Sequence, residues 1–260
     1  MSSIPNGRLL WFELLCQDAA KTADFYTKVC EWTLIPWDMG NGVMYNMLAA
    51  LGVPIGAVFP FPADAPAEHR AKPHWMPYLS TPDTDASVAQ LLGLGGKVWV
   101  PARTVPTVGR MAVVADRTGA EFAFFTPENA PGEAPAAAPV GHVGWIECAV
   151  SDAGVAFADY GALFGWTSAE TFPMGPMGTY HVIHGEGRGI GGFFRSADGS
   201  LPPWRWLCYV RVADLDAAYA KALALGASSV MAPNAVPGGN ARIAMLRDPE
   251  GATFALQWVA

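Results

Sequence analysis

Two glutamates, Glu13 and Glu147, are the residues of this sequence best placed to do chemistry. Each follows a tryptophan by two positions, Trp11 or Trp145, inside a mostly apolar segment that predicts a strand. Side chains two apart on a strand share a face, so each carboxylate is expected on an aromatic-lined face. A carboxylate in that setting is costly unless it is paired. It would therefore bind a donor group on a ligand, act as a general base, or pair with a cation.

Arginine is the natural cationic partner for these carboxylates. Arg110 and Arg242 occur at matching places in the two halves of the chain, as the glutamates do. A Glu–Arg pair would either hold strands together or form part of a binding site, and ion pairs are often only structural. Both alternatives stay open from the sequence.

Large aromatic residues also recur at matching places in the two halves. The set comprises Trp11, Tyr45, Trp75 and Tyr78 in the first half, and Trp145, Tyr180, Trp206 and Tyr209 in the second. Such side chains either fill an interior completely or form an apolar wall on which a planar ligand stacks. We predict that these eight residues, with Glu13, Glu147, Arg110 and Arg242, bind a ligand.

A second set of donors offers an alternative chemistry. His74 is expected on the same strand face as Tyr78, and with Glu13 and Glu121 it would supply three metal ligands. The second half does not repeat this set, because Thr253 stands near the position that corresponds to Glu121. We therefore predict no metal and no other cofactor, and keep a divalent ion on Glu13, His74 and Glu121 as the alternative.

An internal repeat decides the organisation of the chain. When the sequence is shifted by roughly half its length, identical residues coincide, among them Asp18 with Asp152, Tyr26 with Tyr160, and Trp32 with Trp166. Between the copies, residues 128–139 are rich in proline and alanine, which suits an extended linker. The sequence thus predicts domains at 7–127 and 140–260.

Within each copy the hydrophobic period changes in a fixed order. A strand is followed by a helix that begins after an aspartate and then by three short strands, and this order occurs twice. In the first copy the predicted strands are 8–16, 33–37, 43–48, 55–59, 75–80, 97–100, 109–115 and 120–126, and Asp18 and Asp83 precede the helices. The chain therefore contains four βαβββ units. These units must pair, because one unit alone would leave a hydrophobic sheet face exposed to solvent.

The motifs that recur in these units resemble a known superfamily. The segment Asp18-x6-Phe25-Tyr26-x5-Trp32 and the hairpins that begin at Asp116 and Asp248 are similar to those of the vicinal-oxygen-chelate proteins, which include glyoxalase I, extradiol dioxygenases and bleomycin-resistance proteins. The tandem glyoxalase-like subgroup is the most similar. The resemblance implies an α+β fold of two domains, each a curled mixed sheet that forms a cup with its helices outside.

The same resemblance implies where a metal would be held. Catalytic members of the superfamily carry His or Glu ligands at positions that fall here on Trp11, Met76 and Ala123 in the first copy, and on Trp145, Leu207 and Ala255 in the second. None of these side chains is a nitrogen or oxygen donor to a divalent ion. The superfamily's metal site is therefore expected to be absent from both cups.

Composition excludes several classes of function. The chain has 260 residues, of which 52% are hydrophobic and 15% charged, enough apolar material for a folded core. A net charge of −7 without lysine or arginine clusters argues against nucleic-acid binding. Glycines and prolines interrupt the uncharged run 39–63, so no membrane span is expected. Four scattered cysteines and no visible signal peptide favour the cytoplasm.

These observations predict a glyoxalase-like protein that binds a small hydrophobic or aromatic molecule in an aromatic-lined cup without metal. One alternative is a metal-dependent lyase, isomerase or dioxygenase with a displaced metal site. The other is a structural or partner-binding protein with filled cups. Whether the chain is an enzyme stays open; an enzyme of this superfamily would be a lyase or an oxidoreductase. Four units can complete two cups internally, which allows a monomer or a weak homodimer.

Overall fold

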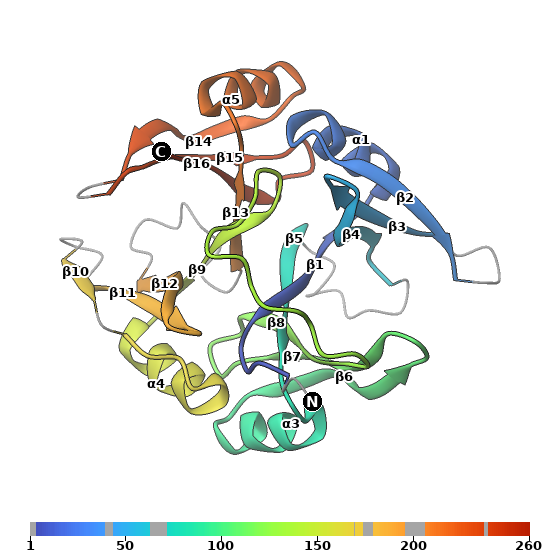
Figure 1. Cartoon of the computed structure of the whole chain (residues 1–260), viewed down its shortest axis with the longest axis vertical. Helices are drawn as coiled ribbons and strands as arrows, with labels where there is room; N and C mark the ends of the chain where they lie inside the picture. The colour runs from blue at the N-terminus through green and yellow to red at the C-terminus, as the bar shows by residue number, and fades with distance from the viewer. Residues whose placement is uncertain are drawn as a thin grey trace. The chain divides into compact units, whose positions relative to one another are not determined.

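The computed structural model describes residues 4–39, 44–62, 72–168, 170–173, 179–195, 206–236 and 239–260. It contains four βαβββ modules in tandem, which confirms the predicted α+β fold (Figure 1). No helix among the described residues combines the length and the apolar character needed to cross a membrane.

The first two modules come from the first copy of the repeat. Module 1 consists of β1 (Leu9–Cys16), α1 (Ala19–Val29), β2 (Thr33–Asp38), β3 (Met44–Ala50) and β4 (Val53–Pro60). Module 2 consists of β5 (His74–Ser80), α3 (Thr84–Gly93), β6 (Lys97–Val105), β7 (Gly109–Ala115) and β8 (Glu121–Pro127).

The second copy supplies the other two modules. Module 3 consists of β9 (Val143–Val150), α4 (Ala153–Phe164), β10 (Thr171–Pro173), β11 (Thr179–Gly185) and β12 (Arg188–Arg195). Module 4 consists of β13 (Trp206–Arg211), α5 (Leu215–Ala224), β14 (Ser228–Ala235), β15 (Ala241–Arg247) and β16 (Thr253–Val259).

Every module has the same strand order. In module 1 the order across the sheet is β1-β4-β3-β2. The first and fourth strands of a module pair in parallel, and the other neighbouring strands pair antiparallel. Each of the four described helices begins after an aspartate whose carboxylate accepts a backbone N–H of the first turn. These aspartates are Asp18, Asp83, Asp152 and Asp214. The predicted helix starts are therefore confirmed.

The chain divides into two compact units. Unit 1 comprises Met1–Trp11, Met76–Ala134 and Ile146–Trp206, and unit 2 comprises Phe12–Trp75, Pro135–Trp145 and Leu207–Ala260. Each unit thus joins one module from each copy: modules 2 and 3 in unit 1, and modules 1 and 4 in unit 2. The predicted boundaries 7–127 and 140–260 describe the sequence copies, and their role as separate folding domains stays a prediction.

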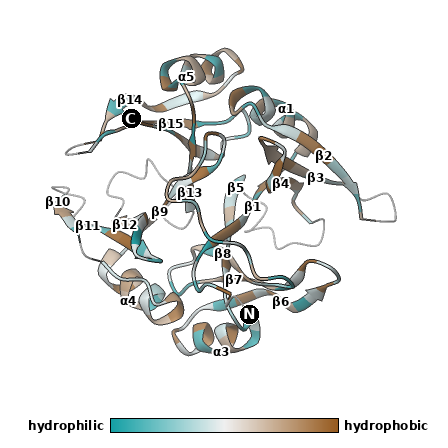
Figure 2. Ribbon diagram, in the orientation of Figure 1, coloured by the Kyte–Doolittle hydropathy of each residue, from teal (hydrophilic) through white to brown (hydrophobic). Residues whose placement is uncertain are grey.

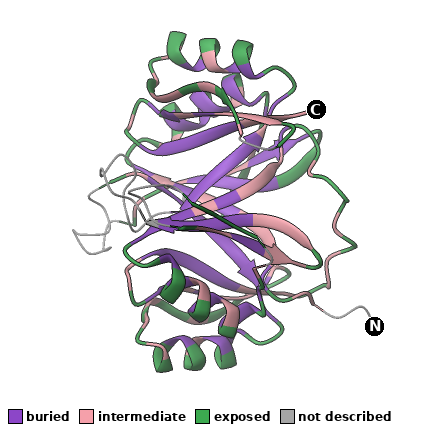
Figure 3. Cartoon of the chain, turned by 90° about the vertical axis from the view of Figure 1, so that its left-hand side faces the viewer, coloured by how far each residue is buried: buried purple, intermediate pink, exposed green. Residues whose placement is uncertain are grey.

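An aromatic cluster forms the core of each unit. In unit 2 the ring of Tyr26 on α1 lies 5.2 Å from the rings of both Trp75 and Phe254. In unit 1 the ring of Tyr160 on α4 lies 5.4 Å from Phe122 and 5.5 Å from Trp206. Figure 2 shows the hydrophobic colouring of strands such as β3 and β4, and Figure 3 shows that the exposed residues gather on the outward side of the helices.

A tyrosine–aspartate hydrogen bond joins the two modules of each unit. The Tyr26 hydroxyl donates to Asp248 at 3.0 Å, and the same carboxylate accepts the backbone N–H groups of Glu250 and Ala252. The Tyr160 hydroxyl donates to Asp116 at 3.2 Å in unit 1. Burial raises the pKa of Asp248, and the hydrogen bonds that it accepts oppose this rise.

All four cysteines are free and buried, which confirms the prediction that they are core residues. Burial raises the pKa of the Cys16 thiol, and of the Cys208 thiol, to about 12. At neutral pH these thiols stay protonated, so they are poor nucleophiles.

Replacing Tyr26 with Phe is expected to lower the free energy of unfolding by about 1–3 kcal/mol, because the buried carboxylate of Asp248 loses a donor. Urea unfolding at pH 7 measures this loss. The half-exposed Tyr219 provides a matched control, since Tyr219→Phe should change the free energy of unfolding little. Equal losses in the two variants would contradict the role assigned to the Tyr26 hydroxyl.

The raised pKa of Asp248 also gives stability a dependence on pH. The native state holds the proton more tightly than the unfolded chain, whose carboxyl pKa is near 3.8. The contribution of this group is therefore greatest below pH 3.8 and falls as the pH rises through the raised native value. Wild type should lose stability relative to Asp248→Asn over this interval, as measured by urea unfolding at several pH values; a constant difference would contradict the raised pKa.

Candidate functional site

Strand alternation gives each module sheet two different faces. In β1 the side chains of Phe12 and Leu14 are buried on the side of α1, whereas Glu13 points to the opposite side and is half-buried. We call the side of a module sheet opposite its own helix the distal face. In β9 the same alternation places Glu147 on the distal face and Ile146 and Cys148 beneath α4.

In unit 2 the Glu13 carboxylate is bound by a tyrosine from a strand that is not its neighbour. The Tyr45 hydroxyl on β3 donates to Glu13 Oε1 at 2.7 Å, across the intervening strand β4. The Tyr45 ring also lies 5.5 Å from the ring of Phe59 on β4 and 6.3 Å from that of Trp37 on β2. The carboxylate, the phenol and the aromatic rings therefore form one cluster on the distal face of module 1.

Unit 1 contains the same arrangement in module 3. The Tyr180 hydroxyl on β11 donates to Glu147 Oε1 at 2.7 Å, across β12. The ring of Tyr180 stacks on that of Phe194, with centroids 6.0 Å apart and planes inclined by 23°. The structure thus joins predicted site residues in two matching pairs, Glu13–Tyr45 and Glu147–Tyr180.

The chemistry of these pairs follows from their atoms. An ionised carboxylate only accepts hydrogen bonds and has two oxygens, whereas the phenol donates one proton and can still accept. Hydrogen bonds to a charged acceptor are stronger than those between neutral groups. Beside aromatic rings, such a pair suits a ligand that combines a planar apolar body with a hydroxyl or N–H donor.

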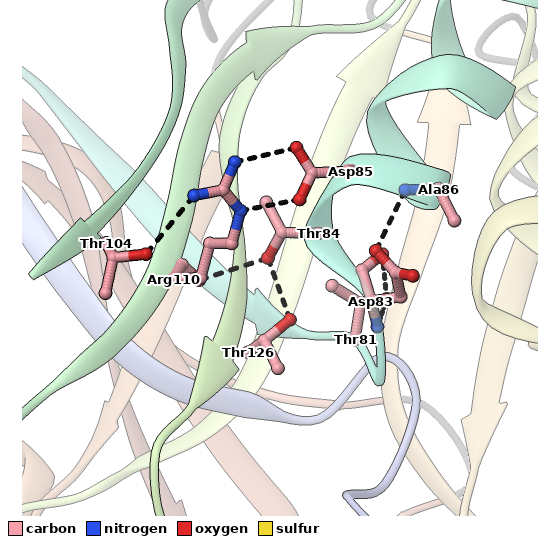
Figure 4. Close-up of polar contacts among 8 residues, drawn as sticks. All are labelled: Thr81, Asp83, Thr84, Asp85, Ala86, Thr104, Arg110 and Thr126. Carbon is pink, nitrogen blue, oxygen red and sulfur yellow. Dashed lines mark hydrogen bonds and ion pairs between the residues drawn. The ribbon is translucent and has the colours of Figure 1, made fainter.

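Arg110 and Arg242 were predicted as partners of the glutamates, and this pairing is corrected. Arg110 on β7 forms a bidentate bond with Asp85 in the first turn of α3, at 2.5 and 2.8 Å, and a further bond with Thr104 (Figure 4). Arg242 binds Asp216 of α5 in the same way, at 2.7 and 3.0 Å. Both guanidinium groups thus lie beside the helices, where a nearby aspartate satisfies them.

Trp75 and Trp206 were predicted on the same wall as the glutamates, and their placement is also corrected. Both side chains are fully buried in the aromatic clusters around Tyr26 and Tyr160. Trp75 packs against Tyr26 of α1 and Trp206 against Tyr160 of α4, which are the helices of modules 1 and 3. Each tryptophan faces the side of its strand opposite Tyr78 or Tyr209, because residues three apart face opposite sides. Their indoles pack the core.

The remaining aromatic candidates keep a distal placement. Alternation puts Tyr78 and Tyr209 opposite the buried tryptophans of their strands, and the ring of Tyr78 lies 6.3 Å from that of Phe125. Trp11 and Trp145, both half-buried, share the strand face of Glu13 and Glu147 respectively.

The candidate metal ligands do not converge among the described residues. These residues contain no group of three or more His, Cys, Asp or Glu side chains that could hold an ion, so Glu13, His74 and Glu121 do not converge as the alternative required. His74 is buried, with Nδ1 2.9 Å from the carbonyl oxygen of Lys72. Ala123 lies beside Tyr78 in the pairing of β8 with β5, and it has no donor atom where the superfamily carries a ligand.

Phe59 and Phe194 are site residues that the sequence analysis did not select. They occur at matching positions of the fourth strand of modules 1 and 3, directly beside the strand that carries the glutamate. Their recurrence in both copies was the available signal. Strand order was the missing information, because β4 lies between β1 and β3 although it follows both in the chain.

Comparison with known proteins identifies the family. Residues 8–124 and 141–256 each match the model of the glyoxalase/bleomycin resistance protein/dioxygenase superfamily. The chain belongs to this superfamily. The superfamily's fold therefore accounts for the four modules, and its motif hairpins are those whose aspartates bind Tyr26 and Tyr160.

Relatives of similar length are known within the superfamily. The chain is 30% identical over 259 residues to CFP32 of Mycobacterium bovis, whose name assigns it provisionally to the glyoxylases, covering 98% of this chain and 96% of that one. It is 32% identical over 267 residues to the anthracycline biosynthesis protein DnrV of Streptomyces peucetius, covering 98% and 94%.

Solved structures share the fold at low sequence identity. The Mn(II)-bound glyoxalase from Novosphingobium aromaticivorans has a TM-score of 0.66 at 13% identity, over 99% of this chain and 83% of that one. The 2,2',3-trihydroxybiphenyl 1,2-dioxygenase from Sphingomonas wittichii strain RW1 has a TM-score of 0.68 at 12% identity, over 97% and 90%.

The two kinds of tryptophan should differ in their effect on stability. Trp75→Ala is expected to lower the free energy of unfolding by about 3–5 kcal/mol, because it opens a cavity in the unit 2 cluster. Trp11→Ala removes a half-buried side chain on the distal face and should lower the free energy of unfolding clearly less. Urea unfolding of the two variants tests this placement, and a larger loss for Trp11→Ala would contradict it.

Proposed function

We propose that this protein binds a small aromatic molecule that carries a hydroxyl donor, at the Glu–Tyr pairs of modules 1 and 3. The ligand ring packs on the distal aromatic residues, and its hydroxyl donates to the carboxylate. The binding residues are Glu13, Tyr45 and Phe59 in module 1, and Glu147, Tyr180 and Phe194 in module 3.

One observation carries this proposal: the same carboxylate–phenol hydrogen bond, 2.7 Å long, occurs on the distal face of both modules. Burying a carboxylate beside aromatic rings costs free energy, and a purely structural face would be more stable with apolar side chains. A ligand with a matching donor regains that cost when it binds.

The curated relatives support an aromatic ligand. DnrV is named for anthracycline biosynthesis, and anthracyclines are polycyclic aromatic compounds. The identity of 32% over nearly the whole of both chains supports a ligand of that general class for this protein.

We propose that binding needs no metal and no other cofactor. Two observations support this. Trp11, Met76 and Ala123 stand where the superfamily carries metal ligands, and none of them has a nitrogen or oxygen donor for a metal. The carboxylate of Glu13 accepts a hydrogen bond from the Tyr45 hydroxyl. We further propose that the chain works in the cytoplasm, without nucleic acid or membrane, as a monomer or weak homodimer.

The probe 2-naphthol tests the proposal, because it has a planar ring system and one hydroxyl. We expect it to quench the tryptophan fluorescence of the wild-type protein in a saturable way. The double variant Glu13→Gln, Glu147→Gln should weaken this binding about tenfold, because a charged acceptor is replaced by a neutral one. The exposed Glu128 provides a matched control, and Glu128→Gln should leave the affinity unchanged.

Two further measurements separate the alternatives. Binding of 2-methoxynaphthalene, which lacks the donor, should be equally weak in wild type and double variant. Treatment with a chelator should leave the 2-naphthol affinity unchanged. Absence of any saturable quenching would favour filled cups, and a stoichiometric metal that is lost in Glu13→Gln would favour the metal-dependent enzyme.

A further inference from the structure

The hydrogen bonds of the two Glu–Tyr pairs have the same length, but the residues of the strand between glutamate and tyrosine differ. The residue directly across from Glu147 in the pairing of β9 with β12 is Gly192, and the residue directly across from Glu13 in the pairing of β1 with β4 is Ala57. Both are buried, and both lie beneath the path that the tyrosine takes from the third strand to the glutamate. The tyrosines therefore cross a bare backbone in unit 1 and a methyl group in unit 2.

Gly192 is required by the position of Tyr180. A Cβ atom added at Gly192 would overlap the Cζ and Oη atoms of the Tyr180 ring. The phenol consequently lies directly against the backbone of β12 while its hydroxyl reaches Glu147. A side chain at this position would push the ring away from β12 and out of its near-parallel contact with Phe194. The Tyr45 ring, which crosses the methyl group of Ala57, keeps its hydrogen bond to Glu13 but lies at a larger angle to its neighbouring phenylalanine.

The orientation of the rings follows from this contact. Tyr180 and Phe194 are nearly parallel, at 23°, whereas Tyr45 and Phe59 are inclined by 54° with centroids 5.5 Å apart. A planar ligand can align with both rings only where the two rings are themselves close to parallel. In unit 2 a ligand that stacks on one ring is tilted against the other.

We infer that Gly192 makes the Glu147–Tyr180 pair the site for fused planar rings, and that the Glu13–Tyr45 pair binds such ligands more weakly. Gly192 is a positioning residue that acts through Tyr180 rather than by touching the ligand. This inference rests on the proposed function, since it states which of the two pairs takes the planar aromatic class and why.

The substitutions Gly192→Ala and Ala57→Gly test the inference with 2-naphthol as the probe. Gly192→Ala should weaken the tighter 2-naphthol site about tenfold, because the displaced Tyr180 ring no longer lies nearly parallel to that of Phe194. Ala57→Gly should not weaken it. Equal effects of the two substitutions, or no effect of Gly192→Ala, would overturn the inference.

A double-mutant cycle separates positioning from general damage to β12. In a Tyr180→Ala background the clash is removed, so Gly192→Ala should cause no further loss of 2-naphthol affinity. An additional loss of the same size as in wild type would show that Gly192 acts on the strand rather than through Tyr180, and would overturn the positioning role.

The crystal structure of Gly192→Ala decides the matter independently of any ligand. We expect the Tyr180 ring to be tilted against that of Phe194, as the Tyr45 ring is tilted against that of Phe59; an unmoved ring would overturn the inference. If wild type binds no 2-naphthol, the proposed function fails for this class of ligand, while the position of Tyr180 in this structure still tests the role of Gly192.

Discussion

The alternation of side chains along the strands is the constraint on which the site depends. It separates the aromatic side chains of the strands into those that pack beneath a helix and those on the distal face. The first group packs against Tyr26 of α1 and Tyr160 of α4, whose hydroxyls donate to the buried aspartates Asp248 and Asp116. In modules 1 and 3 the second group surrounds a half-buried carboxylate and so presents polar and aromatic atoms together on the distal face.

The repeat makes the distinction between structural and functional pairs clearer. Three kinds of polar pair occur in both copies: Tyr with buried Asp, Arg with exposed Asp, and Tyr with Glu on the distal face. The first joins modules across a unit, and the second ties a strand to the start of a helix. The Tyr–Glu pair joins two strands that already belong to one sheet. Its presence in both copies is therefore the hardest of the three to explain by a need of the fold.

Much of the fold could be predicted from the sequence because its signals are local. The helix starts at Asp18, Asp83 and Asp214 depend on one side chain and the first turn that it caps. The order of strands and helices follows from hydrophobic period, and shifting the chain against itself revealed the four modules. The resemblance to the superfamily rested on motifs that the structure places in the α1 helix and in the hairpins after β7 and β15.

The site was only partly predictable because its contacts depend on strand order. Glu13 was assigned to Arg110 by charge alone, whereas a helix aspartate next to Arg110 occupies that guanidinium and a tyrosine two strands away reaches Glu13. The placement of Trp75 could have been corrected from the sequence, since three positions separate it from Tyr78. The role of Gly192 could not, because it follows from how one ring lies over one backbone position.

The central claim is that a carboxylate–phenol pair on the distal face receives the hydroxyl of a planar aromatic ligand. A crystal structure of the metal-free protein with bound 2-naphthol tests this most directly. The account predicts the naphthol oxygen within hydrogen-bond distance of Glu147 and its rings packed against Tyr180. Density for the ligand elsewhere, with the Glu147–Tyr180 pair untouched, would contradict it.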